Sequence, residues 1–176
     1  SKTDIQDPAY ARHEVLGWNY RMSDVVGAVA LAQLERLGEL VQARVTSAEL
    51  FRQALGSCSW LTLQKTPGNC IHAWWAFPVK IERDSVEWHA FRDKYAQLGG
   101  DGIYAAWKLS YLEPAFQKHN FLGREKLMEP FGAYFYGPGL CPVAEDLQPR
   151  LLQFKTNYWD SDQAARQAQL LAETIA

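Results

Sequence analysis

The stretch that decides the fold is GWNYRMSD at residues 17–24, followed by VVGAVALAQLE at residues 25–35. Ser23 carries a side-chain oxygen that can cap a helix, and the negative charge of Asp24 suits the positive end of the helix dipole. The apolar positions that follow recur close to a 3.6-residue period, and no proline interrupts them. The pattern predicts a helix from Ser23 to about Leu55, with Gly38 as the expected point of a bend or break.

The two halves of this predicted helix differ. From Val25 to Leu34 nearly every side chain is apolar or small, so no face of the helix is polar. From Glu35 onward a single apolar stripe is accompanied by charged residues. A helix that is apolar all round must be covered all round, and the roughly 120 residues that remain form too small a body to cover it. The sequence therefore predicts that a further domain or a partner subunit buries the first half.

Downstream of Gly56 the pattern changes to short strands with helices between them. Expected strands lie at Trp60–Leu63, at Ile71–Ile81 with an interruption at Pro78, at Gly102–Leu109 and at Leu151–Phe154. One expected helix runs from a capping box of Asp84 and Glu87 to Leu98 and is ended by Gly99-Gly100. Two further helices are expected over Pro142–Leu147 and from a cap at Asp160 or Ser161 to the C-terminus. No Pro- or Gly-rich linker separates two domains, and the order of the elements indicates an α+β fold.

Composition argues against several classes of function. Of the 176 residues, 48% are hydrophobic and 22% are charged, and the net charge is −2. These values are typical of a globular protein and predict neither a nucleic-acid nor a membrane partner. The three cysteines are widely spaced without a Cys-x-x-Cys pair, which favours a reducing, cytoplasmic location. The four histidines match no metal-ligand spacing, so no metal site is expected.

The polar residues just before the predicted helix carry the first indication of chemistry. Asn19 offers two amide donors and Arg21 offers a forked cation. Both precede a helix start, where backbone N–H groups and the helix dipole favour an anion such as a phosphate or a carboxylate. The same two side chains can instead satisfy only the turn and the helix end, and their spacing alone does not decide between these interpretations.

The same block carries a resemblance to a known family. Residues 17–24, with Ala28, Ala30–Glu35, Leu37 and Arg44, resemble the start of the C-terminal half of the DegT/DnrJ/StrS-type sugar aminotransferases. The likeness continues at Gly102–Ile103, at Cys141–Glu145 and at the start of the last helix, and so spans nearly the whole chain. Members of this family are pyridoxal-phosphate (PLP) enzymes. The resemblance implies the small domain of the fold-type-I, aspartate-aminotransferase fold: a long N-terminal helix, then a small, mainly antiparallel sheet with flanking helices.

The resemblance also implies a function. Family members transfer an amino group, usually from glutamate, to a nucleotide-linked keto sugar, as in cell-surface polysaccharide biosynthesis. The asparagine of the block reaches across a homodimer interface to the PLP phosphate of the neighbouring subunit, and this role is expected of Asn19. Arg21 is the second candidate for a contact with the cofactor. The resemblance further implies a homodimer formed through the helix that begins at Ser23.

One part of the family pattern is missing from the sequence. The resemblance implies a Schiff-base lysine in the N-terminal large domain, upstream of the block, and none of the eight lysines here has that context. Neither a P-loop nor a Gly-x-Ser-x-Gly elbow occurs, so no residue of this chain is expected to be catalytic. We therefore expect residues 1–22 to come from the large domain and residues 23–176 to form the small domain, which is inactive alone.

Four further residues are candidates for substrate binding, and three of them have an alternative interpretation. His13 lies where relatives often carry His, but it is equally explained as an exposed loop residue. Trp107 and Lys108 belong to an aromatic segment that can hold a sugar or diphosphate, or can simply form core. Tyr158 follows an expected strand in a late loop near the pocket. The alternative for the whole chain is a non-catalytic α+β dimerisation or interaction module.

Overall fold

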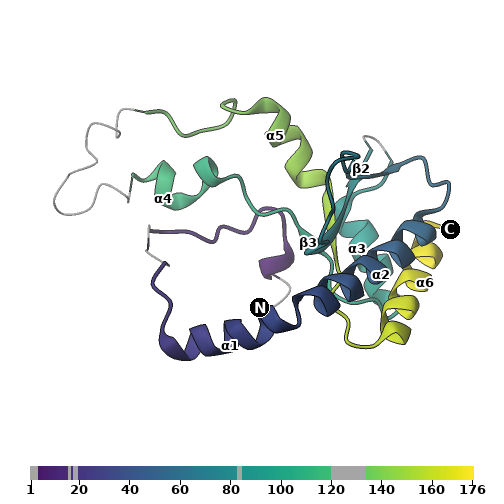
Figure 1. Ribbon diagram of the computed structural model, residues 1–176. Helices are drawn as coiled ribbons and strands as arrows, with labels where there is room; N and C mark the ends of the chain where they lie inside the picture. The colour runs from purple at the N-terminus through teal and green to yellow at the C-terminus, as the bar shows by residue number, and fades with distance from the viewer. Residues whose placement is uncertain (1–3, 16, 18–19, 83–84, 120–133) are drawn as a thin grey trace. The chain divides into compact units, whose positions relative to one another are not determined.

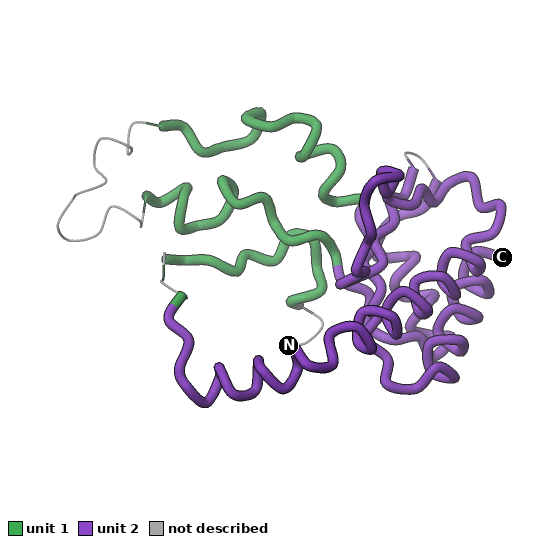
Figure 2. Tube along the Cα trace, in the orientation of Figure 1, with its two compact units in different colours: residues 1–20, 105–150 green, residues 21–104, 151–176 purple. Residues whose placement is uncertain are grey.

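A computed structural model describes residues 4–15, 17, 20–82, 85–119 and 134–176. The chain divides into two compact units, coloured separately in Figure 2. Unit 1 contains residues 1–20 and 105–150, and unit 2 contains residues 21–104 and 151–176. The described elements form an α+β fold with six α-helices and one four-stranded sheet, as the sequence predicted.

The predicted long helix is two helices, α1 (Asp24–Glu35) and α2 (Leu37–Leu55). The break falls at Arg36, whose φ of −102° and ψ of 8° leave the helical region. The N–H of Arg36 turns to the carbonyl of Gln33, which tightens the last turn of α1. The expected interruption is therefore present, two residues before the predicted Gly38.

The sheet has the strand order β1-β2-β4-β3. Its strands are β1 (Leu61–Leu63), β2 (Ala76–Ile81), β4 (Leu151–Lys155) and the short β3 (Tyr104–Ala105). β1 runs antiparallel to β2, with Leu61 opposite Ile81, and β2 runs antiparallel to β4, with Phe77 opposite Phe154.

Two predicted strands are shorter than expected. β2 begins at Ala76 instead of Ile71 and continues through Pro78, which lies opposite Gln153. A proline has no N–H to donate to a neighbouring strand. Because β1 ends opposite Val79, no β1 residue lies beside Pro78 to need that donor. The predicted strand at Gly102–Leu109 is reduced to the two residues of β3.

One face of the sheet is buried under helices (Figure 1). Along β2 and β4 every second side chain is buried, the period of a sheet with one covered face. On the covered face the ring of Phe51 from α2 lies 5.5 Å from Phe77 and 5.4 Å from Phe154. Tyr95 of α3 (Trp88–Gln97) packs edge-on against Phe154 at 5.5 Å. These three rings and that of Tyr95 thus form part of the aromatic core.

The ends of α3 show one error and one success of the sequence prediction. The N-cap is Glu87, whose side chain makes no capping bond, so the predicted capping box does not start this helix; Asp84 lies outside the described residues. At the C-terminal end Gly99 has a φ of +95°, a value that favours glycine. A Cβ at Gly100 would lie 2.3 Å from the ring of Tyr95. The Gly99-Gly100 stop is therefore required by both backbone and packing.

The closing helix α6 (Ser161–Ile175) begins as predicted. The N-cap is Asp160, whose carboxylate accepts a hydrogen bond from the N–H of Asp162 at 2.9 Å. α6 packs against α2 and α3. The side chains that it buries are Ala164, Ala168, Leu170, Leu171 and Thr174.

Unit 1 has little regular structure in its described residues. Its longest element is α5 (Pro142–Leu147), which the sequence predicted, and α4 (Pro114–Gln117) is a single turn. Three short 3₁₀ turns complete it: Asp4–Gln6, Ser110–Leu112 and Gln148–Arg150. The unit is held together mainly by side-chain bonds to the backbone, which are described below.

Candidate functional site

The start of α1 has the geometry that the sequence predicted. Ser23 is the N-cap, with the extended ψ of 159°, and its Oγ accepts a hydrogen bond from the N–H of Val26 at 3.4 Å. Asp24 occupies the first turn, where the helix dipole favours negative charge. The backbone N–H groups and the dipole at such a helix start favour an anion.

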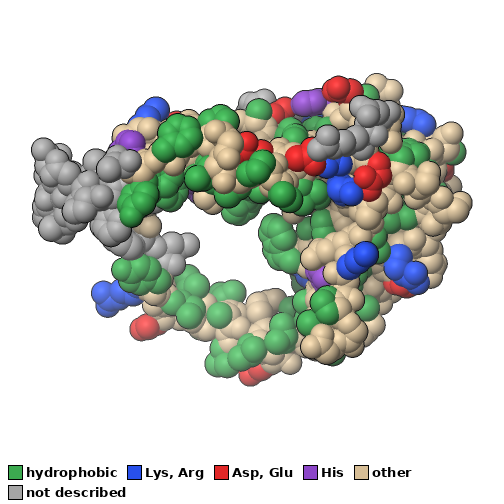
Figure 3. All heavy atoms as spheres, turned by 90° about the horizontal axis from the view of Figure 1, so that it is seen from above, with side chains coloured by type: hydrophobic (Ala, Val, Ile, Leu, Met, Phe, Trp, Pro, Cys, Tyr) green, Lys and Arg blue, Asp and Glu red, His purple; other side chains and the backbone are tan. Residues whose placement is uncertain are grey.

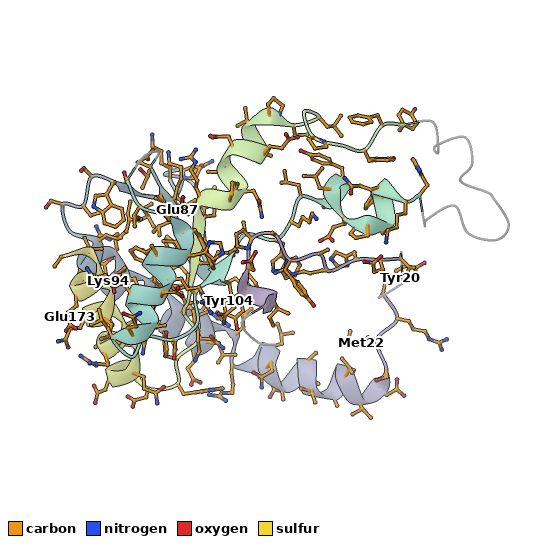
Figure 4. All side chains as sticks on the ribbon, turned by 180° about the vertical axis from the view of Figure 1, so that it is seen from behind. Tyr20, Met22, Glu87, Lys94, Tyr104 and Glu173 are labelled. Atoms are coloured by element: carbon orange, nitrogen blue, oxygen red, sulfur yellow. The ribbon has the colours of Figure 1, made fainter. Side chains whose placement is uncertain are left out.

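The residues just before Ser23 lie at the surface. Tyr20, Arg21 and Met22 are all exposed. Tyr20 and Met22, labelled in Figure 4, are 81% and 61% exposed. Arg21 forms no ion pair within the described part of the chain, so its positive charge is uncompensated there. Asn19 lies outside the described residues, and its contact with a phosphate stays a prediction.

The surface of α1 is apolar and open. None of the residues of α1 is buried. Its larger apolar side chains are 55–75% exposed: Val25, Val26, Val29, Leu31 and Leu34. Figure 3 shows one face of the molecule, on which hydrophobic side chains (green spheres) lie among polar ones. A row of open apolar side chains along a helix marks an interaction site.

His13 has an exposed side chain on a fixed backbone. Its carbonyl accepts a hydrogen bond from the N–H of Ala115 at 2.8 Å, and its own N–H donates to the Glu113 carboxylate at 3.2 Å. Both partners come from the start of α4, about a hundred residues away. The backbone of His13 is thus held from two sides while its ring faces solvent.

The Trp107 ring lies close to the side chain of Arg12, the residue before His13 in the chain. The guanidinium of Arg12 stands 5.5 Å from the centre of the Trp107 ring and 5.3 Å from that of Tyr10. Arg12 also donates to the carbonyls of Tyr10 at 3.1 Å and Ile5 at 2.7 Å. The structure therefore places the Trp107 ring beside the side chain of Arg12, the residue that precedes His13, within unit 1. Lys108 is half-buried directly after Trp107.

Tyr158 belongs to unit 2 and is largely committed to internal bonds. Only 8% of it is exposed, and its hydroxyl donates to the Asp101 carboxylate at 3.0 Å. Lys155 covers its ring at 4.7 Å and lies 3.5 Å from the same carboxylate. Burial, followed by the Asp101 charge, raises the pKa of Tyr158 well above its ordinary value. The hydroxyl therefore stays protonated and bound to Asp101.

A cavity of about 330 Å³ lies in unit 2 beside Tyr158. Its wall includes Tyr158, Trp159 and Arg44, and side chains from the end of α1 and the start of α2. Arg44 is half-buried and donates to the carbonyl of Trp75 and to the hydroxyl of Thr156, both at 3.0 Å. The Arg44 guanidinium therefore ties α2 to the chain around the sheet.

A second carboxylate organises the turn before α5. Glu145 accepts hydrogen bonds from the Tyr111 hydroxyl at 2.5 Å and from the N–H groups of Gly139 at 2.8 Å and Cys141 at 3.2 Å. These bonds, that of Tyr111 first, hold the pKa of Glu145 below its ordinary range. Burial and then the Glu145 bond raise the pKa of Tyr111 to about 12. Glu145 thus fixes the turn that precedes α5.

The described residues contain neither a metal centre nor a spanning helix. No three His, Cys, Asp or Glu side chains among them gather closely enough to hold a metal ion. None of the helices in the described ranges has the length and apolar character needed to cross a membrane.

Sequence reasoning missed three residues that shape the neighbourhood of His13: Arg12, Glu113 and Gln148. Gln148 donates from one amide to the carbonyls of Pro8 and Ala106, both at 2.9 Å. The bonding partners of Glu113 and Gln148 lie 42 to 140 residues away in the chain. No local sequence pattern predicts such long-range bonds. The one signal in the sequence is that Arg12 is a cation that can pair with an aromatic-rich segment.

Comparison with curated proteins finds several relatives of part of this chain. RfbH of Salmonella typhimurium, a lipopolysaccharide biosynthesis protein, is 33% identical over 95 residues, which are 51% of this chain and 22% of RfbH. GDP-perosamine synthase of Vibrio cholerae is 26% identical over 72 residues, 41% of this chain and 19% of the synthase. EpsN of Bacillus subtilis, a pyridoxal phosphate-dependent aminotransferase by name, is 26% identical over 126 residues, 70% of this chain and 31% of EpsN. The chain thus spans a fifth to a third of their length.

Solved structures share the fold. DesV of S. venezuelae superposes with a TM-score of 0.68 at 21% identity over 93% of this chain and 39% of its own. Helicobacter pylori PseC gives 0.68 at 14% identity over 95% of this chain and 41% of its own. E. coli GDP-4-keto-6-deoxy-D-mannose-3-dehydratase, solved with hydrated PLP, gives 0.60 at 20% identity, over 91% and 37%. A sequence model of the DegT/DnrJ/EryC1/StrS aminotransferases matches residues 4–129, well over half of the chain, and the protein therefore belongs to that family.

Proposed function

We propose that this chain forms part of a PLP-dependent aminotransferase that moves an amino group, with glutamate as donor, onto a nucleotide-linked keto sugar in the cytoplasm. The observation that carries the proposal is the family match over residues 4–129, which contains the block at residues 17–24. In the structure this block leads directly into the capped start of α1. The name of the related GDP-perosamine synthase supports a nucleotide-linked sugar as the substrate class.

In this proposal the boundary between the large and the small domain lies near Ser23. Residues 1–22 complete the large domain and residues 23–176 form the small domain. The Schiff-base lysine comes from sequence outside this chain, because the family pattern places it upstream of the block. The isolated chain is then inactive.

The residues around the start of α1 fit one anionic group. Arg21 is an exposed and locally uncompensated cation, and the capped helix start adds the positive end of a dipole. Asn19 contributes a neutral amide donor to the same phosphate, and Arg21 is the second contact. When bound, PLP supplies the electron sink for amino transfer. The role of this chain is to hold the phosphate end of the cofactor.

The cofactor phosphate belongs to the neighbouring subunit, and α1 provides the homodimer interface. The support is the open apolar surface of α1, which has no cover within the described residues of its own unit. Apolar side chains of this size gain free energy when water is removed from them. A second copy of the same helix is the occupant that the symmetry of a homodimer supplies.

The substrate contacts are proposed in two places. His13, Trp107 and Lys108 lie in unit 1, where the exposed ring of Trp107 and the cation of Lys108 suit a sugar or a diphosphate. In unit 2, Tyr158 contributes part of the wall of the 330 Å³ cavity. Its hydroxyl is not part of this contact, because it is bonded to Asp101.

The test of the cofactor contact is Asn19→Ala in the complete enzyme. Loss of one donor to a bound anion should weaken PLP binding by about 1–3 kcal/mol, measured as the PLP dissociation constant in an absorbance titration. Asn69→Ala is a matched control, because Asn69 is an exposed asparagine in a turn of unit 2. An unchanged dissociation constant in Asn19→Ala would remove Asn19 from the site.

A second test uses the isolated chain. After incubation with PLP and reduction with borohydride, we expect no mass increase from a covalently attached cofactor. A stoichiometric adduct on one lysine would show that this chain supplies the Schiff-base residue itself. If the complete enzyme also binds no PLP, the interaction module becomes the better description.

A further inference from the structure

The side chain of Arg12 lies against two aromatic rings of unit 1. Its guanidinium stands 5.3 Å from the centre of the Tyr10 ring and 5.5 Å from that of the Trp107 ring. Trp107 is 59% exposed and Tyr10 is 37% exposed, so both residues reach solvent. A cation over an aromatic face is attracted by the electron-rich ring and keeps its charge. These three side chains, which we call the Arg12 platform, therefore offer a ligand one positive charge and two apolar rings.

The positive charge of Arg12 has no acidic partner in the part of the chain that the structure describes. Within those residues its guanidinium donates to two carbonyls, that of Tyr10 at 3.1 Å and that of Ile5 at 2.7 Å. A guanidinium carries five N–H donors in a fixed fork, so further donors remain for another acceptor. A planar cation of this kind binds a phosphate or a carboxylate through parallel hydrogen bonds.

Hydrogen bonds between distant parts of the chain hold the platform in place. The Gln148 amide donates to the carbonyls of Pro8 and Ala106, both at 2.9 Å, and so links the two segments that carry the rings. The Glu113 carboxylate, in a residue that is only 1% exposed, accepts from the backbone N–H of Arg12 at 2.9 Å. Groups that are fixed before a ligand arrives lose less conformational entropy when it binds. The platform is therefore preorganised by the fold of unit 1.

We propose that the Arg12 platform binds the diphosphate of the nucleotide-linked sugar, with the Trp107 ring packed against an adjoining ring of the same substrate. The inference rests on the proposed function, because it concerns the substrate of that reaction. The amino donor also carries a negative charge that a guanidinium can bind. The rings favour the diphosphate, because a nucleotide-linked sugar presents ring faces next to its negative charges, whereas glutamate has no ring.

The first test measures nucleotide binding to the complete enzyme by isothermal titration calorimetry. The probes are GDP and UDP, a purine and a pyrimidine nucleoside diphosphate without a sugar to be aminated. Arg12→Gln should weaken the binding of the tighter probe about ten- to hundredfold, the factor for losing hydrogen bonds to a charged group. Trp107→Ala removes the exposed ring and should weaken it about three- to tenfold.

Two further variants serve as controls in the same titration. Arg12→Lys keeps the charge but loses the planar fork, so its affinity should lie between those of Arg12→Gln and wild type. Arg52→Gln removes the same charge from an exposed position of α2 and should bind like wild type. A wild-type enzyme that binds neither probe, or equal binding by wild type and Arg12→Gln, would overturn the inference.

The second test separates substrate binding from a purely structural role of Arg12. In Arg12→Gln the KM for the nucleotide-linked sugar should rise about ten- to hundredfold. The KM for the amino donor, the PLP dissociation constant and the melting temperature should be unchanged. Loss of a structural brace would instead loosen the whole unit and alter these quantities together. An equal rise of both KM values would therefore assign Arg12 to bracing alone and overturn the inference.

The outcomes also distinguish the inference from the proposed function. If Asn19→Ala weakens PLP binding and Arg12→Gln leaves both KM values unchanged, the inference is wrong while the proposed function stands. If the wild-type enzyme aminates no nucleotide-linked sugar but binds GDP or UDP through Arg12, the proposed function fails and the platform is still a diphosphate site.

Discussion

Helices α1 and α2 correspond to one predicted long helix with an expected bend or break at Gly38, and they have opposite environments. No residue of α1 is buried, although its apolar side chains face every direction. α2 carries more charge and buries Ser47, Ala48, Phe51 and Leu55 against its own unit. The more apolar helix is therefore the more exposed one.

The difference teaches that hydrophobic content and burial within one chain are separate properties. α2 has a single apolar stripe, which one layer of neighbours can cover. α1 would need neighbours on all sides. A helix of 12 residues is marginal alone in water, and we therefore infer that cover from outside the unit stabilises α1. The four predictions below test this contrast.

The largest effect is expected in α2. Phe51 is fully buried between Phe77 and Phe154, and Phe51→Ala should lower the free energy of unfolding by about 3–5 kcal/mol. Leu31→Ala in α1 should change it by less than about 0.5 kcal/mol when the isolated chain is monomeric. Urea unfolding followed by circular dichroism measures both. A large loss in Leu31→Ala would mean that α1 packs within its own chain.

The next effect concerns association. Leu31→Glu places a charge in the proposed α1 interface and should raise the dimer dissociation constant by about a hundredfold, measured by sedimentation velocity. Gln42→Glu adds the same charge to an exposed position of α2 and should leave association unchanged. A wild-type chain that remains monomeric at high concentration would remove α1 as the dimer interface.

A smaller effect is expected at the two helix caps. Ser23 and Asp160 each accept a backbone hydrogen bond at the first turn of their helix, and replacing either by alanine costs about 1 kcal/mol locally. Because α6 is part of the core, Asp160→Ala should lower the unfolding free energy by that amount. Ser23→Ala should instead reduce helical content in the isolated chain without shifting the main unfolding transition. Equal shifts of the transition in both variants would contradict the contrast.

The smallest effect on stability is expected from a surface ion pair on α2. Hydrogen bonds from Arg52 and then Gln53 lower the pKa of Glu49 to about 2. Since the folded pKa lies below the unfolded value of 4.5, the pair stabilises the fold above pH 4.5, and this contribution is lost as the pH falls towards 2. A carboxyl NMR titration should show the low midpoint, and Arg52→Gln should raise it. A midpoint near 4.5 in wild type would show that the pair is not formed.

Local signals predicted much of the fold. The caps at Ser23 and Asp160, the strands β1 and β4, the Gly99-Gly100 stop and the turn at α5 follow from rules that act within a few residues. The errors have non-local causes. β2 continues through Pro78 because β1 ends before that position, and α3 begins at Trp88, whose indole N–H donates to the Leu151 carbonyl at 2.9 Å.

The candidate site likewise contains features that local sequence predicts and features that depend on distant contacts. The block at residues 17–24 and its helix were identified from consecutive residues. The setting of His13 and Trp107 was not, because it depends on Arg12 between two rings and on the Glu113 carboxylate. The loop position of Tyr158 predicts a substrate contact, whereas the structure buries its side chain and bonds its hydroxyl to Asp101.

The sequence by itself determined the family, the order of the helices and strands, and an apolar helix that needs external cover, because each depends on residue types at short spacing. The tertiary structure alone decided that the helix breaks at Arg36, that Arg44 ties α2 to the chain around the sheet, and that Glu113 is buried beneath the backbone of Arg12 and His13. These features arise from contacts between residues far apart in the chain. Their energies depend on distance and burial, which no local pattern contains.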